Sequence, residues 1–346
     1  MKERVRKVFR RLKGQGGFTL IELLIVIAIM GFLIAMIAPR LAKVASGASD
    51  TVCDTNQMRL RQVLAAYTEK TGQLPNYLTS LVCHDDAGKA VDPSTQWDMT
   101  KEEDGSKGWY IDNNNKVDGQ EVLSKDFYAM TKLGLLTLDQ AAADELRALG
   151  ISKIYYLNVN QDVKAMEYIG NEVKKLNEGI PKHVAGKNDF MQEDDVKAGT
   201  AVLAVGFGDN HKLDPTAGPK KIGHPDRIGC IVLGVGPNSE LVREGQIQHA
   251  GLCPNGIKRG DHFLYNNYNI VVPRLASVAD KIVAAYGGTN GVKLTFKNEE
   301  TGETKIVDIA KGQGEEVWQF TTFCPEGCNP MAADRPVWVL DKVETY

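Results

Sequence analysis

The sequence predicts an α+β protein in which a long N-terminal helix packs on an antiparallel β-sheet head with helical and loop insertions. Three observations lead to this expectation. An apolar run fills residues 18–38, apolar residues at helical spacing continue to about residue 70, and short β-type runs separated by turn residues recur from about residue 150. The composition, 43% hydrophobic and 25% charged, is that of an ordinary globular chain. A length of 346 residues leaves room for an anchor and one or two folded modules.

Residues 1–17 form a basic leader. They carry seven Lys and Arg residues and one Glu, a net charge of +6, whereas the whole chain carries −3. A basic segment before an apolar run is a topology signal, because Lys and Arg stay on the cytoplasmic side of the membrane. The rest of the chain is acidic, and this argues against nucleic-acid binding, which needs a clustered basic surface.

The apolar run from Phe18 to Ala38 contains one charged residue, Glu22, and is long enough to span a bilayer as a helix. Inserting a carboxylate into the membrane within such a span costs about 3 kcal/mol of free energy, so Glu22 is expected to have a partner. A secretory signal peptide would need a shorter apolar stretch followed by a small-residue cleavage site. Here the glycine pair precedes the run instead. A plain membrane anchor remains an alternative, although it gives no reason for Glu22.

The helix is expected to continue beyond the membrane span. Residues 40–70 contain no proline, and Leu60, Val63, Leu64 and Tyr67 fall at helical spacing. We therefore expect one helix over about 18–70, with a transmembrane part at 18–38 and an amphipathic part at 39–72. Gly72 is a suitable stop.

The head is expected to cover residues 73–346, with an inserted subdomain at about 85–200. Further helices are expected at 127–134, 137–150, 161–178 and 273–286. Strands are expected at 154–159, 200–206, 227–235, 263–272, 292–297, 304–309, 316–323 and 337–342.

The segment Gly16-Gly17-Phe18-Thr19-Leu20-Ile21-Glu22 resembles the cleavage signal of type IV prepilins and type II secretion pseudopilins. The resemblance covers the basic leader, the glycine before the cut, the aromatic first mature residue and the acidic fifth one. It continues along the apolar helix to Pro39 and is strong over residues 10–70. It implies that prepilin peptidase cuts between Gly17 and Phe18 and methylates the new amine of Phe18.

The resemblance also implies how the mature helix assembles. Glu22 would face the Phe18 amine of its own or a neighbouring subunit, and this ion pair would set the axial register between subunits. Gly31 and Pro39 are expected to be weak points of the helix, because glycine lowers helix propensity and proline removes a backbone hydrogen bond.

The partners implied by the resemblance are other copies or related pilin-like subunits, prepilin peptidase and an inner-membrane assembly platform. The chain would cross the bacterial inner membrane once, with the leader cytoplasmic and the head periplasmic. After assembly it would lie in a pseudopilus or an extracellular pilus.

The predicted function is that of a structural subunit without catalysis. The loop after the helix favours a type II secretion pseudopilin, and a major or minor type IV pilin is the alternative. A ligand-binding or enzymatic head on a pilin anchor is a further alternative, because the head is large. No HExxH or GxSxG motif occurs, and the six histidines are dispersed.

Six cysteines suggest disulfides formed in an oxidising compartment. Neighbour pairing, 53–83, 230–253 and 324–328, is favoured because each pair encloses a short or moderate loop, although sequence alone leaves the pairing open. The pair Cys324 and Cys328 is alternatively half of a zinc site, but no second close pair of Cys or His completes it in the sequence. The cysteines are Cys53, Cys83, Cys230, Cys253, Cys324 and Cys328.

A Ca²⁺ site is considered at Asp112, Asn114 and Asp118, where oxygen donors alternate and a glycine follows. Pseudopilins often hold Ca²⁺ in the head, which favours this hypothesis. However, Lys116 and Leu123 occupy positions where an EF-hand has ligands, so a plain Asn/Asp/Gly turn is the stronger interpretation. Residues 209–214 are a weaker candidate, and no other cofactor is expected.

Overall fold

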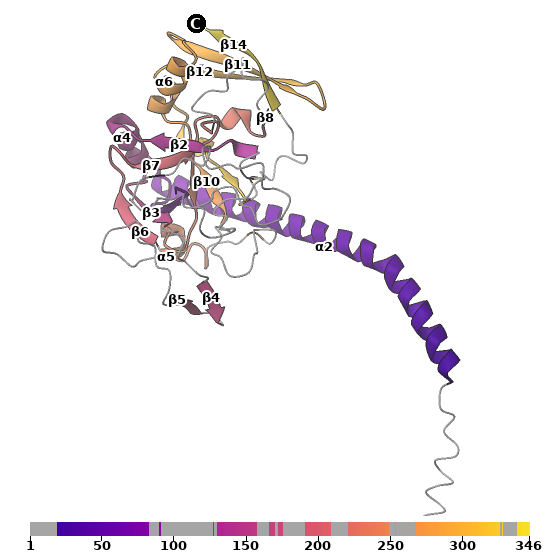
Figure 1. The fold of residues 1–346 in the computed structure, drawn as a ribbon. Coiled ribbons are helices and arrows are strands. Elements are labelled where there is room, and N and C mark those ends of the chain that lie inside the picture. The colour runs from indigo at the N-terminus through magenta and orange to yellow at the C-terminus, as the bar shows by residue number, and fades with distance from the viewer. Residues whose placement is uncertain are drawn as a thin grey trace, which may run out of the picture. The chain divides into compact units, whose positions relative to one another are not determined.

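The computed structural model describes residues 19–82, 90, 127, 130–157, 166–169, 172–175, 191–208, 221–248, 253, 267–325, 327 and 338–346. It divides into two compact units, Met1–Thr51 and Val52–Tyr346. The predicted fold class is confirmed: an apolar N-terminal helix is followed by a mixed head of helices and largely antiparallel sheets (Figure 1). The boundaries proposed for the leader, the helix halves and the inserted subdomain stay predictions.

Helix α2 runs from Leu20 to Thr71, close to the predicted 18–70. It ends at Gly72, which has φ of 70° and donates its N–H to the Thr68 carbonyl at 2.7 Å. A residue in the left-handed conformation closes the last turn in this way, and only glycine adopts it without strain. The predicted stop is therefore confirmed.

The C-terminal part of α2 carries a buried face. Cys53, Gln57, Leu60, Leu64 and Tyr67 follow one another at intervals of four and three residues, and all are buried. Such spacing keeps side chains on one stripe of a helix. The apolar members of this stripe, all except Gln57, join the core of the head, as the predicted amphipathic pattern requires.

The larger sheet has the order β13-β10-β9-β1-β3-β6, and β7 joins it by pairing with β9 and with β2. All pairs are antiparallel except β1 with β3. Strand β9 is buried along its whole length, which explains its continuous apolar run Ile-Val-Leu-Gly. The strands are β1 Leu78–Ser80, β2 Gly134–Thr137, β3 Lys153–Leu157, β6 Met191–Asp195, β7 Ala201–Ala204, β9 Ile231–Gly234, β10 Asn269–Val271 and β13 Thr321–Phe323.

A second antiparallel sheet has the order β12-β11-β14-β8. Helix α6, Ala276–Ala285, contacts β12 and also α4, Gln140–Ala148. Asp139 caps α4 by accepting a hydrogen bond from the Ala142 N–H at 2.9 Å. The strands are β8 Lys221–Ile222, β11 Gly291–Asn298, β12 Thr304–Ala310 and β14 Trp338–Thr345, and the short helices are η4 Pro225–Arg227, α5 Glu240–Arg243 and η5 Val317–Gln319.

The helix predicted at 161–178 is wrong. This segment contains strands β4, Met166–Ile169, and β5, Glu172–Lys175, which pair antiparallel with Ile169 opposite Glu172. The two residues between the strands are Gly170 and Asn171, a dipeptide typical of two-residue hairpin turns. The helical spacing of apolar residues hid this turn signal.

The strand predicted at 316–323 is only partly present. Its first half is the 3-10 helix η5, closed by a reciprocal pair of hydrogen bonds between Glu316 and Gln319, and β13 begins at Thr321. Side chains that hydrogen-bond to backbone groups a few residues away favour such a local turn over a strand.

Candidate processing and assembly site

Helix α2 begins with a reciprocal cap made by Thr19 and Glu22. The Glu22 carboxylate accepts hydrogen bonds at 2.8 Å from both the N–H and the hydroxyl of Thr19. The Glu22 N–H donates to the Thr19 hydroxyl oxygen at 3.3 Å. This is the capping box of a Thr-x-x-Glu sequence, in which each residue satisfies a backbone donor that the first helical turn leaves open.

The capping box gives Glu22 a partner that the sequence analysis missed. The signal was present, since Thr and Glu three residues apart before an apolar run predict such a cap. A carboxylate near the positive end of the helix dipole is also favourably placed. The predicted partner, the amine of Phe18, and the predicted cleavage residue Gly17 lie outside the described residues.

The helical part that follows the cap is exposed on all sides among the described residues. From Leu20 to Ile37 the mean hydropathy is 2.9 and none of the helix is buried. Every side chain from residue 19 to residue 37 is exposed, so the apolar surface runs all round the helix. A helix that is apolar all round needs lipid or other helices as its surroundings.

Gly31 and Pro39 both lie within the uninterrupted span of α2. A Cβ atom placed on Gly31 would meet nothing within 4 Å, so no close approach by the described residues requires this glycine. Their predicted role as weak points during assembly stays a prediction.

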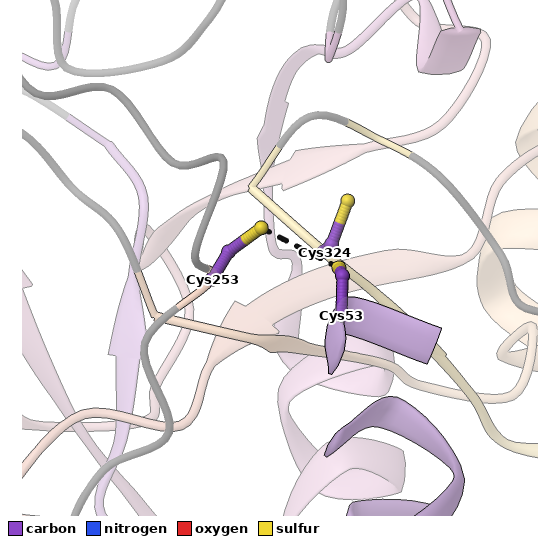
Figure 2. A group of neighbouring side chains, drawn as sticks. All are labelled: Cys53, Cys253 and Cys324. Carbon is purple, nitrogen blue, oxygen red and sulfur yellow. Dashed lines mark hydrogen bonds between the residues drawn. The ribbon is translucent and has the colours of Figure 1, made fainter. Parts of the chain in front are cut away.

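The structure brings together three of the predicted disulfide cysteines from distant segments of the head. Cys53 lies on α2, Cys324 directly follows β13, and Cys253 lies in the chain between α5 and β10 (Figure 2). Their sulfur atoms all lie within 4.8 Å of one another. Cys253 is therefore beside Cys53, whereas neighbour pairing assigned it to Cys230. Cys83 and Cys328 lie outside the described residues.

The four described cysteines differ in their surroundings. Hydrogen bonds from Cys253 and then Cys324 lower the pKa of the Cys53 thiol, since they stabilise its thiolate. Burial raises the pKa of Cys230 to about 12, and the nearby Glu315 carboxylate adds to the effect. Cys230 donates its S–H toward Glu315 at 3.8 Å, and Glu315 forms an ion pair with the buried Arg274 at 3.3 Å. The Cys230 thiol is thus part of a structural polar cluster.

A small pocket of about 170 Å³ lies along the C-terminal part of α2. Pockets that hold drug-sized ligands measure about 300–1,000 Å³, so this one does not support a ligand-binding head. Its lining residues are Asn56, Arg59, Leu60, Val63, Val235, Ile247 and Tyr268.

The predicted Ca²⁺ ligands Asp112, Asn114 and Asp118 lie outside the described residues, as do residues 209–214. Of the histidines, His224 is described and buried. Its ring stacks on Phe323 with centroids 4.4 Å apart, and its Nε2 lies 2.9 Å from the Gly327 carbonyl oxygen. These contacts are structural, because they hold the ring between two segments of the head core.

Residues 12–38 match the family model described as the prokaryotic N-terminal methylation motif. The chain therefore carries the prepilin-type cleavage and methylation signal of type IV pilins and pseudopilins, as the sequence predicted. The motif implies processing by prepilin peptidase and assembly with other pilin subunits, and together with the apolar helix it fits anchoring in the inner membrane. No curated protein and no solved structure matches the chain significantly.

Proposed function

We propose that the chain is a structural subunit of a type II secretion pseudopilus, cut between Gly17 and Phe18 and polymerised through the N-terminal part of α2. The observation that carries the proposal is the capped, fully exposed apolar helix within the matched motif. The loop that follows the helix in sequence favours the pseudopilus over a type IV pilus. In this function the chain performs no catalysis.

Polymerisation follows from the surface of the helix. Once the basic leader is removed, the charges that resist movement of the helix out of the membrane are gone. The exposed apolar surface of Leu20–Ile37 then has equivalent surroundings in a bundle of like helices. Glu22 is the charged side chain of this segment, so its position in such a bundle restricts the axial register to arrangements that give it a cationic partner.

The capping box suggests a test that separates two roles of Glu22. Gln at this position keeps an acceptor for Thr19 but removes the charge, whereas Ala removes both. We expect Glu22→Gln and Glu22→Ala both to insert and to be cleaved, yet to assemble at least about tenfold less than the parent chain. The reason is that a buried charge left without its partner costs about 3–5 kcal/mol. Glu69→Gln, an exposed position on the other half of α2, is the matched control.

The measurement is the intact mass and N-terminal sequence of the chain in the membrane and in sheared filaments, from cells with active prepilin peptidase and a complete assembly system. A methylated N-terminal Phe18 in the filament fraction supports the proposal. Retention of residues 1–17 would contradict the processing step. Normal assembly of Glu22→Gln with failure of Glu22→Ala would show that Glu22 acts as a cap and not in register. Deleting the gene should abolish secretion of an exported enzyme; intact secretion with loss of surface filaments would identify a pilin instead.

A further inference from the structure

Three buried thiols lie close together in the head, and the proposed assembly of the subunit does not use them. Cys53, Cys253 and Cys324 are 5%, 1% and 0% exposed. The Cys53 and Cys253 sulfur atoms are 3.4 Å apart, and the Cys324 sulfur lies within 4.8 Å of both. All three belong to the unit Val52–Tyr346. Figure 2 shows the three side chains gathered where α2, the chain at Cys253 and the end of β13 meet.

The spacing of the sulfur atoms matches shared coordination of one ion. With a zinc–sulfur distance of about 2.3 Å, two thiolates on the same tetrahedral ion lie ~3.8 Å apart. The Cys53 and Cys253 sulfur atoms are 3.4 Å apart and no pair in the group exceeds 4.8 Å, so small shifts would place all three on one ion. A single disulfide would use two of the three sulfur atoms and leave the third thiol buried beside it. A bound ion would use all three.

The polar groups around Cys53 favour a charged sulfur over a disulfide. Gln57, which is 0% exposed, lies one turn along α2 and donates its amide N–H to the Cys53 sulfur at 3.7 Å. Tyr268, also buried, donates its hydroxyl to the Cys53 backbone carbonyl at 3.5 Å and so holds the backbone of this residue in place. Donors placed next to a thiolate ligand disperse its charge and fix its orientation. A disulfide carries no charge that would reward burying an amide in this position.

We propose that Cys53, Cys253 and Cys324 form a thiolate site for a soft metal ion, Zn²⁺ or Cu⁺, with Gln57 as a positioning residue. Thiolates select these ions, and among the described residues no carboxylate or imidazole belongs to the group, so Ca²⁺ and Mg²⁺ do not fit it. Each thiol loses its proton on binding. The sequence lacked a second close pair to complete a zinc site with Cys324, and the fold supplies Cys53 and Cys253.

The site would fasten the C-terminal part of α2 to two segments of the head. Its ligands are 200 and 71 residues apart in the chain and converge only in the folded state, so the ion binds the native chain and stabilises it. This role does not depend on which filament the subunit enters. It can therefore fail while the proposed function stands, and the reverse also holds.

The test uses the full-length chain, exported to its native side of the membrane, solubilised in detergent and purified without added reductant. Elemental analysis is expected to find one zinc or copper ion per chain. After removal of the metal, adding Co²⁺ should produce a thiolate-to-cobalt charge-transfer band. Alkylation mapped by mass spectrometry should modify Cys53, Cys253 and Cys324 only after unfolding with a chelator. Adding Zn²⁺ to the metal-free chain should raise Tm by about 5–10 °C.

Matched variants locate the ligands. Cys53→Ser, Cys253→Ser and Cys324→Ser should each lose the ion, whereas Cys230→Ser, a fully buried cysteine outside the group, should retain it. Gln57→Leu should keep the ion but weaken its affinity by about 10–100-fold. A tryptic peptide pair joined through Cys53 and Cys253 in the parent chain would overturn the proposal in favour of a disulfide. Three reduced, metal-free thiols that bind neither Co²⁺ nor Cu⁺ would overturn it as well, without reliance on any variant.

Discussion

The two ends of helix α2 have the same backbone and opposite surroundings. From Leu20 to Ile37 every side chain is exposed and nearly all are apolar, whereas after residue 52 a single stripe of side chains is buried in the head. The stripe includes two polar residues, Gln57 and Thr68, and a thiol, Cys53. The distribution of apolar residues on a helix thus indicates what surrounds it. A uniform apolar surface fits lipid or like helices, and a narrow stripe with polar positions fits one protein core.

Truncating one leucine in each half of α2 is expected to give the largest difference between the two halves. Leu64→Ala should lower the free energy of unfolding of the head by about 2–5 kcal/mol, because Leu64 is fully buried and its loss leaves a cavity. Leu24→Ala, at a side chain 60% exposed, should leave it unchanged. The measurement is denaturant unfolding in detergent, followed by tryptophan fluorescence. Equal losses in both variants would mean that the first half also packs on the chain.

Two glycines, one within α2 and one directly after it, are expected to differ through their backbone conformation. Gly72→Ala should destabilise the head by about 1–2 kcal/mol, since φ is 70° there and an L-residue is strained in that region. Gly31→Ala should instead stiffen α2, by about 1 kcal/mol of helix propensity, because its Cβ would meet open space. For Gly72→Ala the measurement is the free energy of unfolding of the head. For Gly31→Ala it is the helical content of the isolated anchor in micelles. A neutral Gly72→Ala would refute the strain argument.

The smallest expected effect is a pH dependence confined to the head. Burial lowers the pKa of His224, and Arg227 and Lys305 lower it further, against opposing effects of the Gly327 carbonyl and Asp226. The unfolded chain therefore binds a proton at higher pH than the folded one, so this contribution to stability is present above about pH 6.5 and is lost as pH falls below that value. His224→Gln should flatten the stability profile between about pH 6.5 and 5. An unchanged slope would exclude His224 as its source.

Much of the fold could be predicted because it depends on local patterns. The long apolar run, the helical spacing up to Tyr67 and Gly72 after the last turn together predicted α2. Alternating β-type residues similarly predicted β11 and β12. The prediction failed at 161–178, where apolar spacing and a Gly170-Asn171 turn signal pointed to different structures and pairing between strands decided the outcome.

The N-terminal motif can be recognised from the sequence without the structure. Its basic leader, Gly17-Phe18 junction, Glu22 and apolar helix act through charge, size and periodicity over adjacent residues, and residues 12–38 match the methylation motif without reference to the head. The thiol group was decided by tertiary structure alone. Cys53, Cys253 and Cys324 have no common spacing in sequence, and they meet only because the buried stripe of α2 packs into the core beside β10 and the end of β13. A contact between such distant residues has no local signature, since it depends on how the core closes around them.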